Sequence, residues 1–447
     1  MKQQQANNTA VTNETMQVRI PKATSYYRVT LGALTREGNA LAEIVENGDN
    51  GQQSLRTLSV PAGLPGDEVT IAVETSTRVS PKRRRRRWKA RPPRAWISEI
   101  HRPSPQRVAA RCPVFGECGG CQFQHLDYAA QLAWKRAVVV QLLRDSGGFD
   151  DPPVLEPVPC ANPWNYRNHM RFSVNRAGQP GLTARGSHRV LPLESCPIAH
   201  EQINRALHVL STVPNAQPQV LIRCGAATGQ VLIQPQPEAA IAQKLMEAGL
   251  ELCGETMEEE LAGATFRIRP SSFFQTNTAQ AEQMMRMVVD GIRHSSPSFP
   301  GKMTIVDAYC GVGTFARLLA PYAGKVIAIE ESASAIRDAR WNLREVDNVE
   351  VLQGKVEELL PALGETIDGL VIDPPRAGCQ RGVLDALASH PVRRIVYVSC
   401  DPSTLARDLH ILCHVHSAYH LRSVQPLDMF PHTAHIECIA LLERLTI

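Results

Sequence analysis

Residues 304–442 alternate short apolar runs with segments of helical period, and this alternation is the strongest constraint on the fold. β-branched runs separated by helical segments predict an α/β fold with a doubly wound, Rossmann-like parallel sheet. In such a sheet, ligands bind in the crevice at the carboxyl ends of the strands. The runs expected to form strands are 304–308, 326–330, 349–352, 369–372, 395–398 and 435–442.

The rest of the chain divides by pattern into three further parts. The length of 447 residues favours two or three domains. Residues 1–25 are rich in Gln, Asn and Thr and are expected to form a disordered tail. Short alternating strands in 26–108 predict an OB-like β-barrel. Residues 109–269 predict a small α+β domain, and 270–447 hold the βα units.

Charge is concentrated in one segment. The formal net charge is only +4, so affinity for nucleic acid is expected from local clusters. The run 82–94 is the strongest cluster and includes Trp88. Such a run is typical of a solvated loop, but arginine also pairs with phosphate and tryptophan stacks on bases, so both interpretations stay open.

The N-terminal residues are polar, and no stretch approaches the ~20 apolar residues of a membrane helix. We therefore expect a cytoplasmic protein without a membrane segment. Twelve cysteines, unevenly spread along the chain, do not suggest a secreted disulfide framework. In a reducing compartment, clusters of cysteines favour metal binding or catalysis.

One such cluster comprises Cys112, Cys118 and Cys121, with glycines that let the backbone wrap closely. Three thiolates require a fourth ligand, and Cys196, flanked by Pro197, is the best candidate, with Cys160 as the rival. Four thiolates suit a four-iron four-sulfur cluster, or less readily a structural zinc. Three unligated thiols are the alternative interpretation.

The first βα turn carries a candidate cofactor site. Gly311 and Gly313 follow the strand 304–308, but the third glycine of the dinucleotide fingerprint is missing, which disfavours NAD. Glu330 ends the next strand and can bind the ribose hydroxyls of a nucleoside cofactor. The combination favours a binding site for S-adenosylmethionine. The alternative is a glycine turn that serves only the tight connection between strand and helix.

Three residues carry candidate chemistry. Cys400 ends the run 395–398 just before a helical segment, where a helix dipole is expected to lower the thiol pKa, although an isolated cysteine is more often a buried hydrophobe. Glu437 lies between apolar residues, where desolvation makes a useful general base. Asp373, in Asp-Pro-Pro-Arg, is aimed by rigid prolines and lacks the aromatic neighbour that amino-methylating enzymes use.

Nucleophile, methyl donor and base together fit one reaction. The carbon 5 of a pyrimidine cannot attack a methyl group until a thiolate adds to carbon 6. A base must afterwards remove the carbon 5 proton so that the thiolate leaves. The interpretation therefore requires all three groups in one crevice.

These motifs together resemble the RNA uracil-5-methyltransferase family, in the branch with an N-terminal TRAM barrel and a four-iron four-sulfur cluster. The resemblance covers roughly residues 26–442. It depends on the four cysteines Cys112, Cys118, Cys121 and Cys196 and on the motifs Phe273-Phe-Gln275, Asp307-Ala-Tyr-Cys-Gly-Val-Gly313, Asp373-Pro-Pro-Arg376, Ser399-Cys-Asp-Pro402 and His435-Ile-Glu437. It implies that Cys400 is the nucleophile and Glu437 the base. It further implies a cofactor site of Gln275, Tyr309, Thr314, Glu330 and Asp373, and a cluster held by Cys112, Cys118, Cys121 and Cys196.

The resemblance implies methylation of carbon 5 of one uridine in structured RNA. Ribosomal RNA of the 23S type is favoured over transfer RNA, and no obligate protein partner is implied. Lys355 stands where family members often show Asn or Asp near the adenine, so that contact is not assigned. An RNA-binding or folding factor is the alternative of another class, and a DNA or small-molecule methyltransferase is a weaker one.

Overall fold

The computed structural model describes residues 24–47, 53–74, 94–293 and 303–445. The chain divides into two compact units: residues up to Thr35 with Asn39–Pro105, and Arg36–Gly38 with Gln106–Ile447. The tail through residue 23 and the basic run at 82–93, for which the sequence gives expectations, lie outside the described residues.

The N-terminal unit contains two small antiparallel sheets in its described part. One sheet has the order β1-β4-β5, and the other pairs β2 with β3. Residues from both sheets, among them Ile44, Leu58 and Ile71, share one apolar cluster. The strands are β1 (Thr24–Thr30), β2 (Ala40–Asn47), β3 (Gln53–Val60), β4 (Glu68–Glu74) and β5 (Ala95–Arg102).

The second unit begins with the cysteine-bearing segment and helix α1 (Tyr128–Asp145), whose N-cap Asp127 accepts from the backbone N–H of Ala130 at 3.3 Å. A six-stranded sheet follows, with the order β11-β10-β9-β6-β7-β8. Its strands and helices are β6 (His169–Val174), β7 (Pro180–Thr183), β8 (Val190–Pro192), α2 (Glu201–Ser211), β9 (Gln219–Cys224), β10 (Gln230–Gln234), α3 (Ala239–Glu247) and β11 (Glu251–Cys253).

A hairpin of β12 (Met257–Leu261) and β13 (Ala264–Ile268) precedes helix α4 (Thr278–Arg293). A seven-stranded sheet then forms, with the order β16-β15-β14-β17-β18-β20-β19. Its strands are β14 (Thr304–Ala308), β15 (Lys325–Glu330), β16 (Val349–Gln353), β17 (Gly369–Ile372), β18 (Arg394–Ser399), β19 (Tyr419–Leu427) and β20 (Glu437–Arg444).

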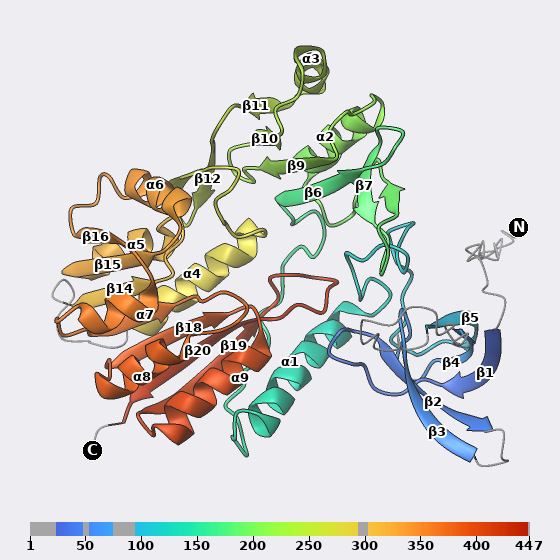
Figure 1. The fold of residues 1–447 in the computed structure, drawn as a ribbon, viewed down its shortest axis with the longest axis horizontal. Helices are drawn as coiled ribbons and strands as arrows, with labels where there is room; N and C mark the ends of the chain where they lie inside the picture. Colours follow the sequence, from blue (N-terminus) through green and yellow to red (C-terminus); the bar gives the residue numbers. More distant parts are fainter. Residues whose placement is uncertain (1–23, 48–52, 75–93, 294–302, 446–447) are drawn as a thin grey trace, which may run out of the picture. The chain divides into compact units, whose positions relative to one another are not determined.

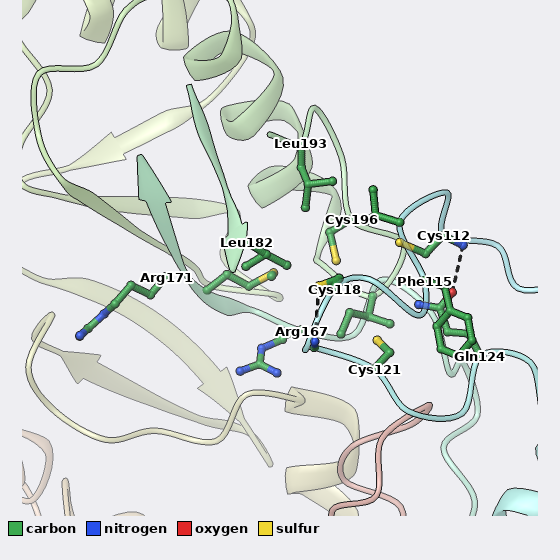
Figure 2. Close-up of a pocket in the computed structure, with 14 residues that line it drawn as sticks. Cys112, Phe115, Cys118, Cys121, Gln124, Arg167, Arg171, Leu182, Leu193 and Cys196 are labelled. Carbon is green, nitrogen blue, oxygen red and sulfur yellow. Dashed lines mark hydrogen bonds between the residues drawn. The ribbon is translucent and has the colours of Figure 1, made fainter. Parts of the chain in front are cut away.

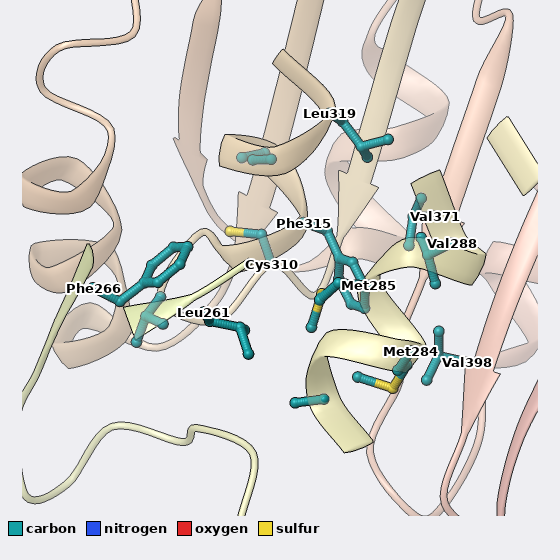
Figure 3. Packing of buried hydrophobic residues seen from close by; sticks show 14 of the residues in the cluster. Leu261, Phe266, Met284, Met285, Val288, Cys310, Phe315, Leu319, Val371 and Val398 are labelled. Atoms are coloured by element: carbon teal, nitrogen blue, oxygen red, sulfur yellow. The ribbon is translucent and has the colours of Figure 1, made fainter. Parts of the chain in front are cut away.

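The seven-stranded sheet has helices on both faces (Figure 1). The helices between and after its strands are α5 (Thr314–Leu319), α6 (Ala333–Asn342), α7 (Val356–Leu359), α8 (Arg381–Ser389) and α9 (Pro402–His410), with short turns η1 (Ala320–Tyr322), η2 (Leu360–Ala362) and η3 (Ile411–Val415). Alternate residues of each strand face opposite cores, so Val396 and Val398 join the cluster with α4 and α5, and Ile395 and Tyr397 join the one with α8 and α9. Figure 3 shows Met284, Met285 and Val288 of α4 near Phe315 and Val398.

Two features differ from the expected parallel sheet. Strand β20 runs antiparallel between β18 and β19, so the sheet is mixed. Strand β19 is not among the predicted strands, because Pro426 and the irregular register between Leu421 and Ser423 interrupt its pattern. Proline is tolerated there because β19 is the edge strand of this sheet.

Helices long and apolar enough to cross a membrane are absent from the part of the chain that the structure describes.

Candidate active site

The register of β18 against β20 brings Cys400 and Glu437 together. Arg394 pairs with Glu443, and the antiparallel pairing continues to Ser399 opposite Cys438. Cys400 follows Ser399 and Glu437 precedes Cys438, so both residues lie at this end of the two paired strands. The carboxylate of Glu437 raises the pKa of Cys400, which places the two side chains close together. The thiol and the carboxyl, 37 residues apart in sequence, therefore share one end of the sheet.

The turn after β18 is fixed by local hydrogen bonds. Asp401 caps α9, because its carboxylate accepts from the backbone N–H of Ser403 at 3.0 Å. The hydroxyl of Ser399 donates to the carbonyl oxygen of Asp401 at 3.1 Å. Cys400 stands between these two residues and is half-buried, so its backbone is held in place by the turn.

Burial controls the protonation of Glu437, whose residue is only 3% exposed. Desolvation raises the pKa of Glu437 well above its ordinary value, the carboxylate of Asp373 raises it further, and the cation of Arg376 lowers it. Desolvation also raises the pKa of Asp373 to about 7. Desolvation thus favours the protonated form of both carboxyl groups near Cys400.

The thiol of Cys400 does not have the low pKa expected at a helix N-terminus. Burial raises its pKa to about 11, the carboxylates of Glu437 and Asp373 add to the rise, and Arg376 opposes it. The expectation of a thiol activated by the helix dipole is therefore wrong for the free protein.

The glycine turn after β14 has the backbone that the sequence predicts. Gly311 and Gly313 adopt positive φ angles of 56° and 84°. A Cβ at Gly313 would lie 2.9 Å from Leu343, whereas a Cβ at Gly311 would meet nothing within 4 Å. Tyr309 also has a positive φ of 64°, which is uncommon for a bulky residue and is typical of functional turns. A side chain at Gly313 would therefore crowd Leu343, whereas the space beside Gly311 is open.

Glu330 is oriented by this turn. One carboxylate oxygen accepts from the backbone N–H of Gly311 at 3.0 Å and the other from that of Ser332 at 2.7 Å. A carboxylate has about four acceptor positions, so further donors can still be bound. Asp307 lies nearby, because the carboxylates of Asp373 and Glu330 both raise its pKa, which burial brings to about 8.

The donor set around the turn fits S-adenosylmethionine. Several carboxyl groups crowded at one sheet edge favour a cationic ligand such as a sulfonium. One oxygen of Asp307, Oδ1, is buried without a hydrogen-bond partner among the described residues. Half-buried Tyr309, Thr314, Glu330 and Asp373 all come from this edge. Gln275 does not come from these strand ends. It lies in the segment before α4, where its backbone carbonyl oxygen accepts from the side chain of Asn168 at 3.1 Å.

Four cysteines line one pocket in the second unit (Figure 2). They are Cys112, Cys118, Cys121 and Cys196. Burial raises the pKa of Cys121 to about 12, and the thiols of the other three add to the rise. Cys160 lies apart, with its thiol 3.2 Å from the carbonyl oxygen of Asn162. Within the described ranges, no three His, Cys, Asp or Glu side chains are grouped closely enough to hold a metal ion.

Arg376 is the last residue of the Asp-Pro-Pro-Arg motif, and no role for it was predicted from the sequence. Its positive charge lowers the pKa of Cys400, of Glu437 and of His435. The available signal was the cation three residues after Asp373, on the same turn. A carboxylate and a cation that leave a strand together at a ligand-binding edge indicate paired electrostatic roles.

The mixed sheet and glycine turn define the class as an S-adenosylmethionine-dependent methyltransferase, and comparison with known proteins agrees. Residues 242–445 match the family model described as tRNA (Uracil-5-)-methyltransferase. An uncharacterized RNA methyltransferase of Gloeobacter violaceus is 34% identical, over 93% of this chain and 96% of the relative. Another, of Listeria innocua, is 32% identical over 86% of this chain and 92% of its own length.

A solved structure supports the same assignment. The tRNA (uracil-54, C5)-methyltransferase of Pyrococcus abyssi, in complex with S-adenosyl-L-homocysteine, superposes with a TM-score of 0.68 and 25% identity. The match covers 93% of this chain and all of that one. The chain belongs to the RNA (uracil-5-)-methyltransferase family. The resemblance inferred from the sequence motifs is therefore confirmed at the level of the family.

The raised pKa of Cys400 predicts a slow thiol in the free protein. At neutral pH, alkylation of the peptide that contains Cys400 should be at least about tenfold slower than that of free cysteine, because only the thiolate reacts. Arg376→Gln should slow it further by removing the cation that favours the thiolate. Peptide-resolved mass spectrometry measures both rates.

The matched control is Arg381→Gln, which removes an exposed arginine paired with Asp385 instead. It should leave the alkylation rate of Cys400 unchanged. Alkylation of Cys400 faster than that of free cysteine would mean that the helix dipole dominates after all.

Proposed function

We propose that the protein methylates carbon 5 of a specific uridine in structured RNA through a covalent adduct between Cys400 and carbon 6. The observation that carries this proposal is the pairing of β18 with β20, which brings Cys400 close to Glu437 and Asp373. A thiol and a buried base at one edge of the sheet suit the first and last steps of this reaction, which are addition to carbon 6 and removal of the carbon 5 proton. The accepting uridine would be extruded from its stack to reach them.

The proposed sequence starts at Cys400. The thiol gives its proton to water, its sulfur bonds to carbon 6, and the electron pair of the carbon 5–carbon 6 double bond moves towards the carbonyl oxygen of the ring. Arg376 stabilises the thiolate that this step requires, because its charge lowers the pKa of Cys400. Carbon 5 of the resulting enolate is the nucleophile for the methyl group.

Glu437 completes the reaction. Its carboxylate takes the proton from carbon 5, the double bond re-forms, and the bond between carbon 6 and the sulfur of Cys400 breaks. Desolvation makes Glu437 a strong base, because its pKa is raised well above the ordinary range. The cation of Arg376 favours its ionised form, because it lowers that pKa. Proton removal and thiol release are thus assigned to one buried carboxylate.

Two bound groups belong to the proposal. S-adenosylmethionine supplies an electrophilic methyl group, and Gln275, Tyr309, Thr314, Glu330 and Asp373 are the residues proposed to hold it. The four cysteines that line the pocket in Figure 2 are soft donors suited to a four-iron four-sulfur cluster, with zinc as the less favoured occupant. Such a cluster would hold together the segments that carry Cys121 and Cys196.

The two small antiparallel sheets of the N-terminal unit support the proposal of an OB-like TRAM barrel over 26–108 that binds RNA. On this division, 109–269 would be the cysteine-bearing domain and 270–447 the methyltransferase domain. Barrels of this kind bind nucleic acid along one face of the sheet. Affinity for RNA would then come mainly from outside the chemical site.

The covalent mechanism predicts opposite behaviour of two variants. Cys400→Ala should reduce methyl transfer by at least about a thousandfold while RNA binding survives, because the nucleophile is lost but the RNA-binding surfaces are not. Glu437→Gln should accumulate a protein–RNA adduct, because carbon 5 keeps its proton. Denaturing gels with labelled RNA show the adduct as a retarded band. Turnover in Cys400→Ala near the wild-type rate would end the proposal.

The substrate can be identified by mapping 5-methyluridine in cells with and without the gene. We expect one position of ribosomal RNA to lose the modification and to regain it with wild-type protein, but not with Cys400→Ala. Loss at a transfer RNA position would assign the substrate to the class named in the family model. No loss in either RNA, with RNA annealing intact in Cys400→Ala, would favour an RNA-folding factor.

The metal proposal predicts that protein purified without oxygen contains about four irons and four labile sulfides per chain. Cys121→Ser and Cys196→Ser should lose iron, because each removes a thiolate from the pocket. Cys160→Ser is the matched control, since its thiol lies apart from that pocket, and should retain iron. Iron loss in Cys160→Ser with retention in Cys196→Ser would reassign the fourth ligand. Zinc in place of iron would identify a structural zinc site.

A further inference from the structure

The segment that leads into Glu437 is held by residues far away in sequence. Residues 428–436, here called the base loop, connect β19 to β20, and Glu437 follows directly. His432, in the middle of the base loop, has a positive φ of 64°. This conformation is uncommon for a residue other than glycine, although histidine adopts it more often than most, and contacts with the surroundings stabilise it. The contacts around His432 therefore indicate what stabilises it.

Gln131 of α1 makes the central contacts. Its Oε1 accepts from the backbone N–H of His432 at 3.0 Å, and its side chain is buried, with the residue only 1% exposed. Its Nε2 donates to the carbonyl oxygens of Phe123 at 3.0 Å and Leu126 at 2.8 Å. One side chain thus joins the base loop to the segment that follows Cys121.

Gln122, the residue after Cys121, makes a second connection. Its backbone N–H donates to the carbonyl oxygen of His432 at 3.0 Å, as does that of Phe123 at 2.9 Å. Its side-chain Oε1 accepts from the backbone N–H of Ala434 at 3.1 Å, and its Nε2 donates to the carbonyl oxygen of Gly119 at 3.2 Å. The Gln122 side chain therefore spans from the cysteine segment to a residue three positions before Glu437.

The start of the base loop is anchored more deeply. Asp428 is 1% exposed, and its two carboxylate oxygens accept from Lys135 Nζ at 2.6 Å and from the hydroxyl of Tyr128 at 2.7 Å. Lys135 also donates to the carbonyl oxygen of Phe430 at 3.1 Å. A buried ion pair with these additional hydrogen bonds resists separation, because either partner alone would be left charged in an apolar interior. The loop is thus fixed at its start and in its middle.

Cys400 is held by other means. It follows β18, whose neighbours are β17 and β20, and precedes α9, which is capped by Asp401. None of the contacts of Gln122 and Gln131 described above involves that turn. A change in the base loop would therefore move the base more than the nucleophile.

We propose that Gln122 and Gln131 are positioning residues for Glu437, so that the cysteine-bearing segment supports the proton-removal half of the reaction rather than the addition of the thiol. This inference rests on the proposed function, in which Glu437 is the base. A misplacement of about 1 Å at a reacting group can cost about a hundredfold in rate. Losing these hydrogen bonds should therefore slow release of the product more than formation of the adduct.

The experiment compares single-turnover adduct formation and product release in Gln131→Met and Gln122→Met. Both variants keep a long side chain and lose its hydrogen bonds. We expect adduct to form at a rate within about threefold of wild type and to resolve about 10- to 100-fold more slowly, so that the retarded band accumulates. Gln122→Glu retains the acceptor for Ala434 and should resolve its adduct faster than Gln122→Met.

Controls separate positioning from general loss of structure. Gln141→Met alters an exposed glutamine of the same helix and should behave as wild type in both steps. A purely structural role would lower the thermal midpoint and slow both steps in parallel, and that result would overturn the inference. If Gln131→Met does not fold, the comparison of Gln122→Met with Gln122→Glu, at a half-buried position, tests the inference alone. Failure of Glu437→Gln to trap adduct would instead overturn the proposed function itself.

Discussion

The antiparallel pairing of β20 with β18 is the constraint on which the site depends. It sets the beginning of one strand beside the end of another, so Glu437 and Cys400 lie at the edge of the sheet where the parallel strands β14 and β17 end. The pairing is held from both faces, because Cys438 and Ala440 pack in one core and Ile439 in the other. A shift by one residue would exchange these faces, so packing of the interior fixes the register of the chemistry.

The same burial makes the site electrostatically costly. Asp307, Asp373 and Glu437 all have raised pKa values because they are desolvated near one another. Stable interiors avoid such groupings unless the charges are paired. Arg376 offsets only part of the repulsion, and a cationic ligand would offset more. The arrangement is thus better suited to a bound state than to the empty protein.

Much of the fold followed from periodicity alone. The strands near 304–308, 326–330, 369–372 and 395–398 are present, since each is an apolar run between breakers. Strand β19 could not be predicted, because Pro426 disrupts its pattern. The direction of β20 could not be predicted either, since the residues of a strand do not reveal which way it runs in the sheet. Periodicity reports burial, whereas direction depends on the long-range packing of the whole sheet.

The positions of site residues were predictable where a turn at a strand end identified them. Their protonation was not predictable, because it depends on charged groups far away in sequence. Gly311, Glu330 and Cys400 stand at strand ends, and the structure finds them there. The protonation of Cys400 could not be predicted from its position before a helix, because Glu437 comes from β20, which is adjacent in the sheet but far away in sequence. Gln122 and Gln131 carry no motif, since their contacts are mostly to backbone atoms, which any sequence supplies.

The raised pKa of Cys400 also bears on damage by oxidants. Peroxides attack thiolates, and cysteines that sense oxidants therefore combine low pKa with exposure. Cys400 is half-buried and its pKa is about 11, so the free protein presents almost no thiolate at neutral pH. On the proposed mechanism, a nucleophile whose neighbours suppress its thiolate between encounters with substrate is protected from conversion to sulfenic acid, without any separate shielding element.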